Sequence, residues 1–232
     1  MVSLGKIPAY QSLKLGPLFN EQVGLLAHDR ARPHHALTLN GTPPTWEVLP
    51  SGFQCLRFDG ANDYLDAPAA DTTDLNFTLQ DYTLAAWINW ENGQDSQVVM
   101  GRYEVDVSGW ELYLYQDPSW YLTLRQHHAG GAAIRTACYS GGWVQNTWHF
   151  MCVTKSGPSA QFYRNGVALE ATCNGGLTDP ETCDRDLVLG IRFTKDANWY
   201  KGFMGSPRVW DRALSVREIR MLFNCERSWV GV

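Results

Sequence analysis

Short apolar or alternating segments, separated by Gly, Asn, Asp and Pro, recur along this chain. Alternation with a period of two predicts β-strands, and the aromatic and β-branched content of the segments supports the same assignment. The segments lie at 53–60, 82–90, 96–103, 110–116, 120–126, 132–139, 148–155, 160–166, 186–193 and 205–212. Strands in this number, with turn residues between them, are typical of a sandwich or a barrel.

Turn and cap residues mark several boundaries between these elements. Asp117-Pro118-Ser119 separates two segments that we expect to pair as a hairpin, and Asn165-Gly166 is the strongest short hairpin signal. Near the C-terminus, Ser215 and Glu218 have the spacing of a capping box, which predicts that a helix begins there. An apolar stripe follows, so we expect one short amphipathic helix packed on the strands.

Several motifs occur in an order that resembles one known family. They are LRFDGANDYL at 56–65, YTLAAWINW at 82–90, NTWHFMCVTK at 146–155, AQFYRNGVAL at 160–169 and GFMGSPRVWDRALSVREI at 202–219. Together they resemble the laminin-G-like domains of the concanavalin A-like lectin/glucanase superfamily, over about residues 19–224. The resemblance implies an all-β fold, a jelly-roll sandwich of two antiparallel sheets. It also implies binding of glycans or proteins, often with a calcium ion near the F-D-G loop.

The regions outside these motifs and the overall composition indicate the domain organisation and exclude some classes of partner. Residues 1–18 show no clear pattern and are expected to be an N-terminal arm or docking segment, with the sandwich over 19–232. The net charge of −5 and the absence of a basic run argue against nucleic acid as a partner. No stretch approaches the ~18 apolar residues of a membrane span, and no signal peptide is recognised.

The six cysteines show no C-x-x-C pair, which disfavours a zinc ribbon. Cys173 and Cys183 flank a loop that a disulfide would close, and this pairing is left open. Cys55 and Cys152 lie in predicted strands, where we expect them to be buried as small apolar side chains.

A calcium site is one hypothesis for the loop after the first motif. Asp59, Asn62 and Asp63 cluster there, and Asp29 from the upstream loop offers a further carboxylate. Calcium prefers six to eight oxygen ligands. The alternative is that these residues form turns and bond their own backbone. Gly205-Ser206, at a position where many members of the family have Asp-Glu, weakens the calcium hypothesis.

The segment at 104–108 carries a partial catalytic motif. Retaining β-glucanases of the same superfamily carry E-x-D-x-x-E or E-x-D-x-E on one strand, and Glu104-Val105-Asp106-Val107-Ser108 resembles this motif. Alternation along a strand would place Glu104, Asp106 and Ser108 on one face. Retaining hydrolysis needs two carboxyl groups about 5–5.5 Å apart, and the second Glu is missing here. We therefore predict that the protein is not an enzyme.

Aromatic residues make up 12% of the chain and include candidates for a ligand-binding face. Sugars stack on flat rings, while a few polar groups fix their orientation. The predicted ligand-binding residues are Tyr103, Trp120, Trp199, Tyr200, Arg125 and Asp106, with Asn198 as a further polar candidate. On the strand at 110–116, one face carries Trp110, Leu112 and Leu114, and the other carries Glu111, Tyr113 and Tyr115.

These observations favour a non-catalytic, lectin-like binding or adhesion module that recognises a glycan or protein surface. One setting would be a bacteriophage virion, where the arm docks on capsid proteins and the sandwich faces outward, so a virion surface or extracellular location is expected. The alternatives are a stand-alone carbohydrate-binding protein and a retaining β-glucanase-type hydrolase, which is disfavoured. Edge strands of a bare sandwich can pair with another chain, so the oligomeric state stays open.

Overall fold

The computed structural model describes residues 10–129, 135–140, 142–170, 172–173 and 177–232. Within these residues, eight strands form a first sheet in the order β14-β13-β12-β7-β17-β5-β4, with β1 paired to β17. Their bounds are β1 Leu13–Leu15, β4 Thr45–Val48, β5 Gln54–Asp59, β7 Tyr82–Trp90, β12 His149–Ser156, β13 Ser159–Arg164, β14 Val167–Leu169 and β17 Lys201–Trp210.

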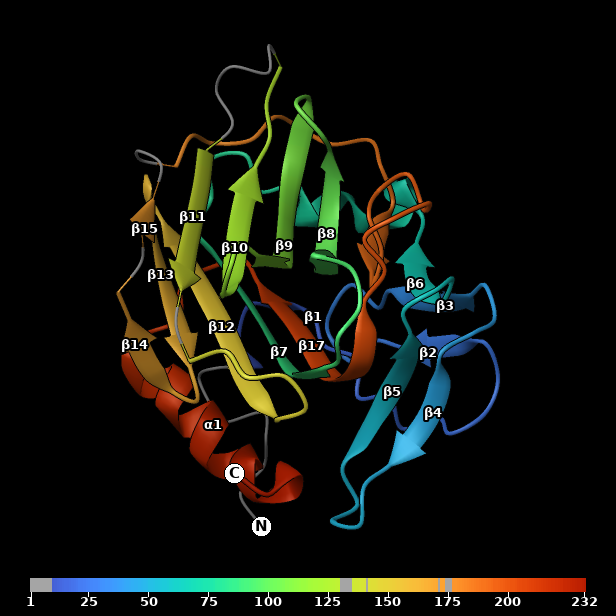
Figure 1. Cartoon of the computed structure of the whole chain (residues 1–232). Helices are drawn as coiled ribbons and strands as arrows, with labels where there is room; N and C mark the ends of the chain where they lie inside the picture. Colours follow the sequence, from blue (N-terminus) through green and yellow to red (C-terminus); the bar gives the residue numbers. More distant parts are fainter. Residues whose placement is uncertain (1–9, 130–134, 141, 171, 174–176) are drawn as a thin grey trace.

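Nine strands form a second sheet in the order β15-β11-β10-β9-β8-β16-β6-β3-β2 within the same described ranges. Their bounds are β2 Leu26–His28, β3 Ala36–Asn40, β6 Tyr64–Ala67, β8 Ser96–Glu104, β9 Ser108–Gln116, β10 Trp120–Gln126, β11 Arg135–Ser140, β15 Thr172–Cys173 and β16 Leu187–Leu189. The strands pair antiparallel, and Figure 1 shows the two sheets as layers of one sandwich. The predicted fold, an all-β jelly roll of two antiparallel sheets, is confirmed.

Alternation along β7 explains why the sandwich has two apolar clusters. Leu84, Ala86 and Ile88 belong to the main core between the sheets, together with Leu112 and Leu114 of β9. The intervening residues Ala85 and Trp87 belong to a second cluster on the other face of the first sheet. Both faces of β7 are therefore removed from water, which accounts for its nearly continuous apolar sequence.

The C-terminal helix α1, Val216–Val230, covers that second face, with Ile219 and Leu222 in the second cluster. It begins with the predicted capping box: Ser215 Oγ accepts from the Glu218 amide, and the Glu218 side chain accepts from the Ser215 amide. Trp87 Nε1 donates to Glu226 Oε2 over 2.8 Å and links the helix to the sheet. Because α1 lies on the first sheet, the outer face of the second sheet around β8, β9 and β10 stays available for a ligand. A 3-10 helix at Ala69–Leu75 is the other helical element described.

The N-terminal segment differs from the prediction of a separate arm. Leu13–Leu15 forms β1 on the edge of β17, and Leu15 is fully buried in the main core. Pairing with a strand edge satisfies backbone groups and burial of Leu15 removes apolar surface from water, so this segment belongs to the sandwich. The domain therefore begins before residue 19, and residues 1–9 of the expected arm lie outside the described residues.

The cysteines follow the prediction in part. Cys55 and Cys152 are buried thiols, as expected. Cys183 is also a free, buried thiol, so it does not close the loop with Cys173, whose side chain lies outside the described part. Among the described residues, the structure contains no helix long and apolar enough to cross a membrane.

Candidate functional site

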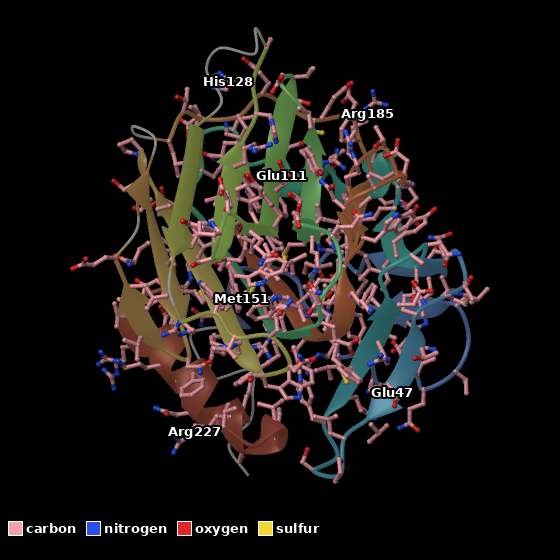
Figure 2. All side chains as sticks on the ribbon, in the orientation of Figure 1. Glu47, Glu111, His128, Met151, Arg185 and Arg227 are labelled. Carbon is pink, nitrogen blue, oxygen red and sulfur yellow. The ribbon has the colours of Figure 1, made fainter. Side chains whose placement is uncertain are left out.

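A groove of about 580 Å³ lies across β8, β9 and β10 of the second sheet. Its volume is in the range of pockets that bind small molecules, roughly 300–1,000 Å³. The lining residues are Ser96, Tyr103, Val105, Glu111, Tyr113, Tyr115, Asp117, Tyr121, Thr123, Arg125, Arg192 and Asn198. Figure 2 labels Glu111 on the green strands that carry the groove. Since Leu112 and Leu114 point into the core, Glu111, Tyr113 and Tyr115 must face outward.

The pairing register places these side chains in rows. Tyr115 faces Tyr121, and Glu111 faces Arg125 across the pair β9–β10. Between these rows, Arg125 Nη2 donates to the Tyr113 hydroxyl over 2.7 Å, and the Arg125 guanidinium lies 5.1 Å from the centre of the Tyr113 ring. One end of the groove is thus aromatic, and the other carries a guanidinium beside a carboxylate.

The Glu111 carboxylate is buried beneath the groove and has two basic neighbours. Its Oε1 lies 3.3 Å from Arg125 Nη1 and 3.1 Å from His127 Nε2. The Asp106 amide donates to His127 Nδ1 over 3.2 Å, so Nδ1 has no proton and Nε2 is the donor toward Glu111. This pair of contacts assigns His127 as the neutral tautomer protonated at Nε2.

Tyr103 lies over this cluster. Its ring stacks on the His127 ring at 5.3 Å with an interplanar angle of 14°. Burial, and after it the charge of Glu111, raises the pKa of the Tyr103 phenol. The hydroxyl therefore stays protonated. Tyr103 therefore offers a neutral hydroxyl and a fixed ring at this end of the groove.

Gly101 makes room for that ring. A Cβ at Gly101 would lie 2.8 Å from Tyr103 Cδ1 and 3.1 Å from Glu111 Cβ. Gly101 pairs with Glu111 across β8–β9 and therefore shares its face of the sheet. The missing side chain is what allows Tyr103 and Glu111 to lie side by side.

Residues between β16 and β17 form one rim of the groove. Asn198 has a positive φ of 57°, and its carbonyl accepts from the Val98 amide over 3.0 Å. Arg192 extends from the same segment, 3.6 Å from the exposed Asp196. The rim is therefore held against β8 by the backbone and presents a weakly paired cation.

The structure brings together only part of the predicted ligand-binding set. Tyr103 and Arg125 line the groove, as does Asn198. Trp120 and Tyr200 do not: both are buried in the main core, since Trp120 packs edge-on against Trp90 and Tyr200 edge-on against Phe58. The large apolar area of these rings is better satisfied between the sheets than at the surface.

The other two predicted residues lie outside the lining. Trp199 is half-buried and contacts Tyr64, with ring centres 6.3 Å apart. Asp106 is exposed, and its contribution is the backbone amide that orients His127. The groove residues outside the predicted set are Glu111, Tyr113, Tyr115, Ser96, Val105, Asp117, Tyr121, Thr123 and Arg192. The polar face of the strand at 110–116 was the signal that pointed to the first three.

The segment 104–108, which resembles a catalytic motif in sequence, has a different local structure from the single strand that was expected. Glu104 ends β8 and Ser108 begins β9, and the two are cross-strand partners. Asp106 lies in the turn between them with a positive φ of 62°. The three side chains are therefore not on one face of a single strand. Glu104 pairs instead with Arg185, with Oε1 2.7 Å from Nη2.

The proposed calcium ligands mainly bond the backbone. Asp59 Oδ1 accepts from the Ala61 and Asn62 amides, and Asn62 Oδ1 accepts from the Thr42 amide. Asp29 uses Oδ1 for the Gly16 and Ala31 amides. No group of three or more His, Cys, Asp or Glu side chains suited to a metal occurs within the described ranges.

Asp63 also accepts a backbone amide, that of Asp59, through Oδ2 over 3.0 Å, but its buried Oδ1 has no hydrogen-bond partner. Burial and then the neighbouring Asp59 raise the pKa of Asp63 to about 7. Two carboxylates fall short of the six to eight oxygens of a calcium site. The Asp59–Asp63 pair therefore fits a shared proton better than a calcium ion.

Comparison with known proteins places this geometry in a family. The model of the concanavalin A-like lectin/glucanases superfamily matches residues 59–220. No sequence among curated proteins matches the chain. Among solved structures, the chain is similar to one of botulinum neurotoxin type C, described with two ganglioside molecules, at 14% identity and a TM-score of 0.70.

Two further similar structures are binding domains of botulinum neurotoxins. The binding domain of botulinum neurotoxin DC with rat synaptotagmin II shares 12% identity at a TM-score of 0.69, and that of serotype D/C shares 13% at 0.71. All three alignments cover 94% of this chain but only 52%, 52% and 53% of the other chains. This chain thus spans about half the length of these relatives, and the likeness concerns the fold.

Proposed function

We propose that this chain, which belongs to the concanavalin A-like lectin/glucanases superfamily, is a non-catalytic glycan-binding module. It holds an oligosaccharide in the groove across β8, β9 and β10. The ligand lies along β9, against Tyr113 and Tyr115. Arg125 contacts sugar hydroxyl groups at the other end.

The observation that carries the proposal is the set of four tyrosines lining one groove on three adjacent strands. Tyr115 is exposed and Tyr121 half-buried, whereas Tyr103 and Tyr113 are buried in the floor of the groove. A tyrosine offers a flat apolar face for a pyranose ring and a hydroxyl for its oxygens. Tyr115 to Glu111 spans four residues of β9, and the groove continues to Tyr103, so its length is about 20 Å at the rise of a strand. That length suits several sugar units rather than one.

The positions of the carboxylates support a binding role over hydrolysis. Within the described lining, the carboxylates are Glu111 and Asp117. They are six residues apart along and just beyond β9, about 20 Å at the rise of a strand. Hydrolysis of a glycoside needs two carboxyl groups roughly 5–9.5 Å apart. Glu111 is moreover held by Arg125 and His127.

The test is binding of purified full chain to an oligosaccharide array, followed by calorimetry on the best ligand. Tyr115→Ala is expected to weaken binding roughly tenfold, equivalent to about 1.4 kcal/mol, while Tyr115→Phe keeps the ring and most of the affinity. Trp229→Ala removes an exposed ring on α1 and serves as the control. No binding across neutral and acidic oligosaccharides would overturn the proposal, and release of reducing sugar would overturn its non-catalytic part.

The larger assembly is a separate prediction. A virion surface, with docking through the N-terminus, remains the expected setting, and a free extracellular lectin is the alternative. Detection of the chain in purified particles would support the first. Recovery only as free protein would support the second.

A further inference from the structure

A second cavity, of about 480 Å³, lies between the segments 10–14 and 30–32, far along the chain from the groove residues of β9. Its lining is Tyr10, Ser12, Leu13, Lys14, Arg30, Ala31 and Arg32. Three of the seven side chains are cations and none is acidic. In a protein with a net charge of −5, such a concentration of positive charge indicates an anionic ligand.

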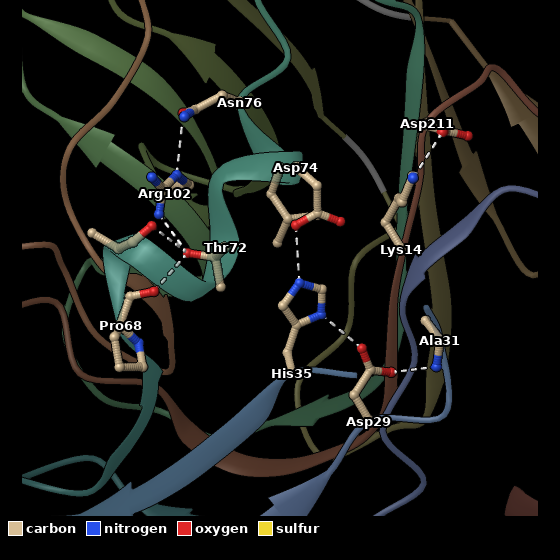
Figure 3. Close-up of polar contacts among 12 residues, drawn as sticks. Lys14, Asp29, Ala31, His35, Pro68, Thr72, Asp74, Asn76, Arg102 and Asp211 are labelled. Carbon is tan, nitrogen blue, oxygen red and sulfur yellow. Dashed lines mark hydrogen bonds and ion pairs between the residues drawn. The ribbon is translucent and has the colours of Figure 1, made fainter. Parts of the chain in front are cut away.

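Asp29 holds the two walls of this cavity together. Its buried Oδ1 accepts from the Gly16 amide over 2.7 Å and from the Ala31 amide over 2.8 Å. Its Oδ2 lies 2.8 Å from His35 Nδ1, as Figure 3 shows for His35, Asp29 and Ala31. Arg30 and Arg32 flank Ala31 directly, so this network fixes the backbone from which both exposed side chains extend.

The cations of the cavity have few acidic partners. Lys14 Nζ lies 3.4 Å from Asp211 Oδ2, a contact that is partly exposed to solvent (Figure 3). Among the described residues, neither Arg30 nor Arg32 has a carboxylate within ion-pair distance. The side chains of both arginines are thus available to a ligand.

A buried ion pair lies near the cavity. Arg208 is fully buried and pairs with Glu226 over 2.7 Å, but its Nη1 has no hydrogen-bond partner. Arg208 interacts electrostatically with both Tyr10 and Arg30, so it lies near the cavity. Desolvation is the first cause of a lowered pKa for Arg30, and repulsion from Arg208 acts in the same direction, while Tyr10, Glu226 and Asp29 act in the opposite direction. A bound anion would relieve this repulsion.

We propose that the basic pocket formed by Lys14, Arg30 and Arg32 binds the phosphate or sulfate group of a ligand. Guanidinium groups present paired N–H donors that match the oxygens of these tetrahedral anions. Three cations around one cavity favour a doubly charged anion over a carboxylate. This site is independent of the glycan groove and does not rest on the function proposed for it.

Calorimetry on the full chain at constant ionic strength tests the pocket. The probes are inorganic phosphate, inorganic sulfate, glucose 6-phosphate and glucose 6-sulfate, with acetate as the monovalent comparison. Saturable binding of phosphate or sulfate groups, with acetate at least tenfold weaker, is expected. The ranking of the two esters identifies whether the natural group is a phosphate or a sulfate.

The double variant Arg30→Gln/Arg32→Gln is expected to lose at least tenfold in affinity for the best probe. Arg217→Gln/Arg220→Gln removes the same charge from exposed positions of α1 and should bind like the unaltered chain. The melting temperature of both variants in chloride reports whether the fold is intact. Absence of saturable binding, binding of acetate equal to that of phosphate, or equal loss in both double variants would each overturn the proposal.

Discussion

His127 Nε2 lies 3.1 Å from Glu111 Oε1 beneath the groove, and both side chains are buried. The imidazole is fixed from its other side by the Asp106 amide. This contact joins the end of β10 to the middle of β9 and gives the Glu111 carboxylate a second donor besides Arg125. The arrangement of the groove floor therefore depends on the His127 ring.

Replacement of His127 tests this dependence. His127→Ala removes one of the donors to the Glu111 carboxylate and the ring under Tyr103, so we expect a loss of about 1–3 kcal/mol in the free energy of unfolding. His127→Gln restores a donor and should recover part of the loss. Urea denaturation measures both, with the exposed His28→Ala as control. Equal stability of His127→Ala and His28→Ala would contradict the assigned contact.

Gly101→Ala tests how the floor of the groove is built. The new Cβ would meet the Tyr103 ring at 2.8 Å, so the ring must move or the strands must separate. We expect a cost of roughly 1–3 kcal/mol, as for other overpacked sites, and weaker binding of a groove ligand. Gly93→Ala is the control, because the nearest neighbour of its Cβ, the Gln97 side-chain amide nitrogen, is farther away at 3.2 Å. A variant with unchanged binding and stability would show that the space beside Tyr103 is not needed.

The Asp59–Asp63 pair predicts a dependence of stability on pH. The pKa of Asp63 is raised to about 7 by burial and by Asp59, so the folded chain binds this proton more tightly than the unfolded chain. The free energy of unfolding should therefore fall as pH rises from about 4 to about 7. Asp63→Asn should flatten this decline, measured by urea denaturation between pH 4 and 8. An unchanged slope in the variant would assign the decline to other groups.

His35 predicts a second, more alkaline transition. Burial lowers the pKa of His35, but hydrogen bonds to Asp29 and Asp74 outweigh it and raise the pKa to about 9 (Figure 3). Charged His35 stabilises the fold below about pH 6.5, and this contribution should be lost as pH rises toward 9. Asp74→Asn removes one partner and should shift the loss to lower pH, read from melting temperatures between pH 6 and 10. If the melting curves of variant and parent keep the same pH profile, Asp74 does not support the charge on His35.

Calcium provides a direct test of the loop at 59–63. The side-chain oxygens of Asp59 and Asn62 already accept backbone amides, so we expect the same melting temperature in a chelator and in millimolar calcium. A calcium-dependent rise would instead identify a site that reorganises around Asp63 Oδ1. Asp63→Asn should abolish such a rise, which would locate the ion.

The sequence alone determined the fold class, the main strands and the helix cap, because these depend on local patterns. Alternation along β7 and β9, the Asn165-Gly166 turn and the Ser215–Glu218 box each act within a few residues. The same alternation separated the core face of β9 from the face of Glu111 and Tyr113. Tyr103 and Arg125 were found because their residue types suit a ligand.

Only the tertiary structure decided which aromatic rings meet solvent and which carboxylates contact a histidine. Trp120 and Tyr200 resemble surface candidates in sequence, but the opposing sheet covers them. The contacts of Glu111 with His127 and of Asp29 with His35 join residues from different strands or loops. The turn at Asp106 prevents Glu104, Asp106 and Ser108 from sharing one face, as they would on an uninterrupted strand. These outcomes follow from how two sheets pack and register, which no short stretch of sequence encodes by itself.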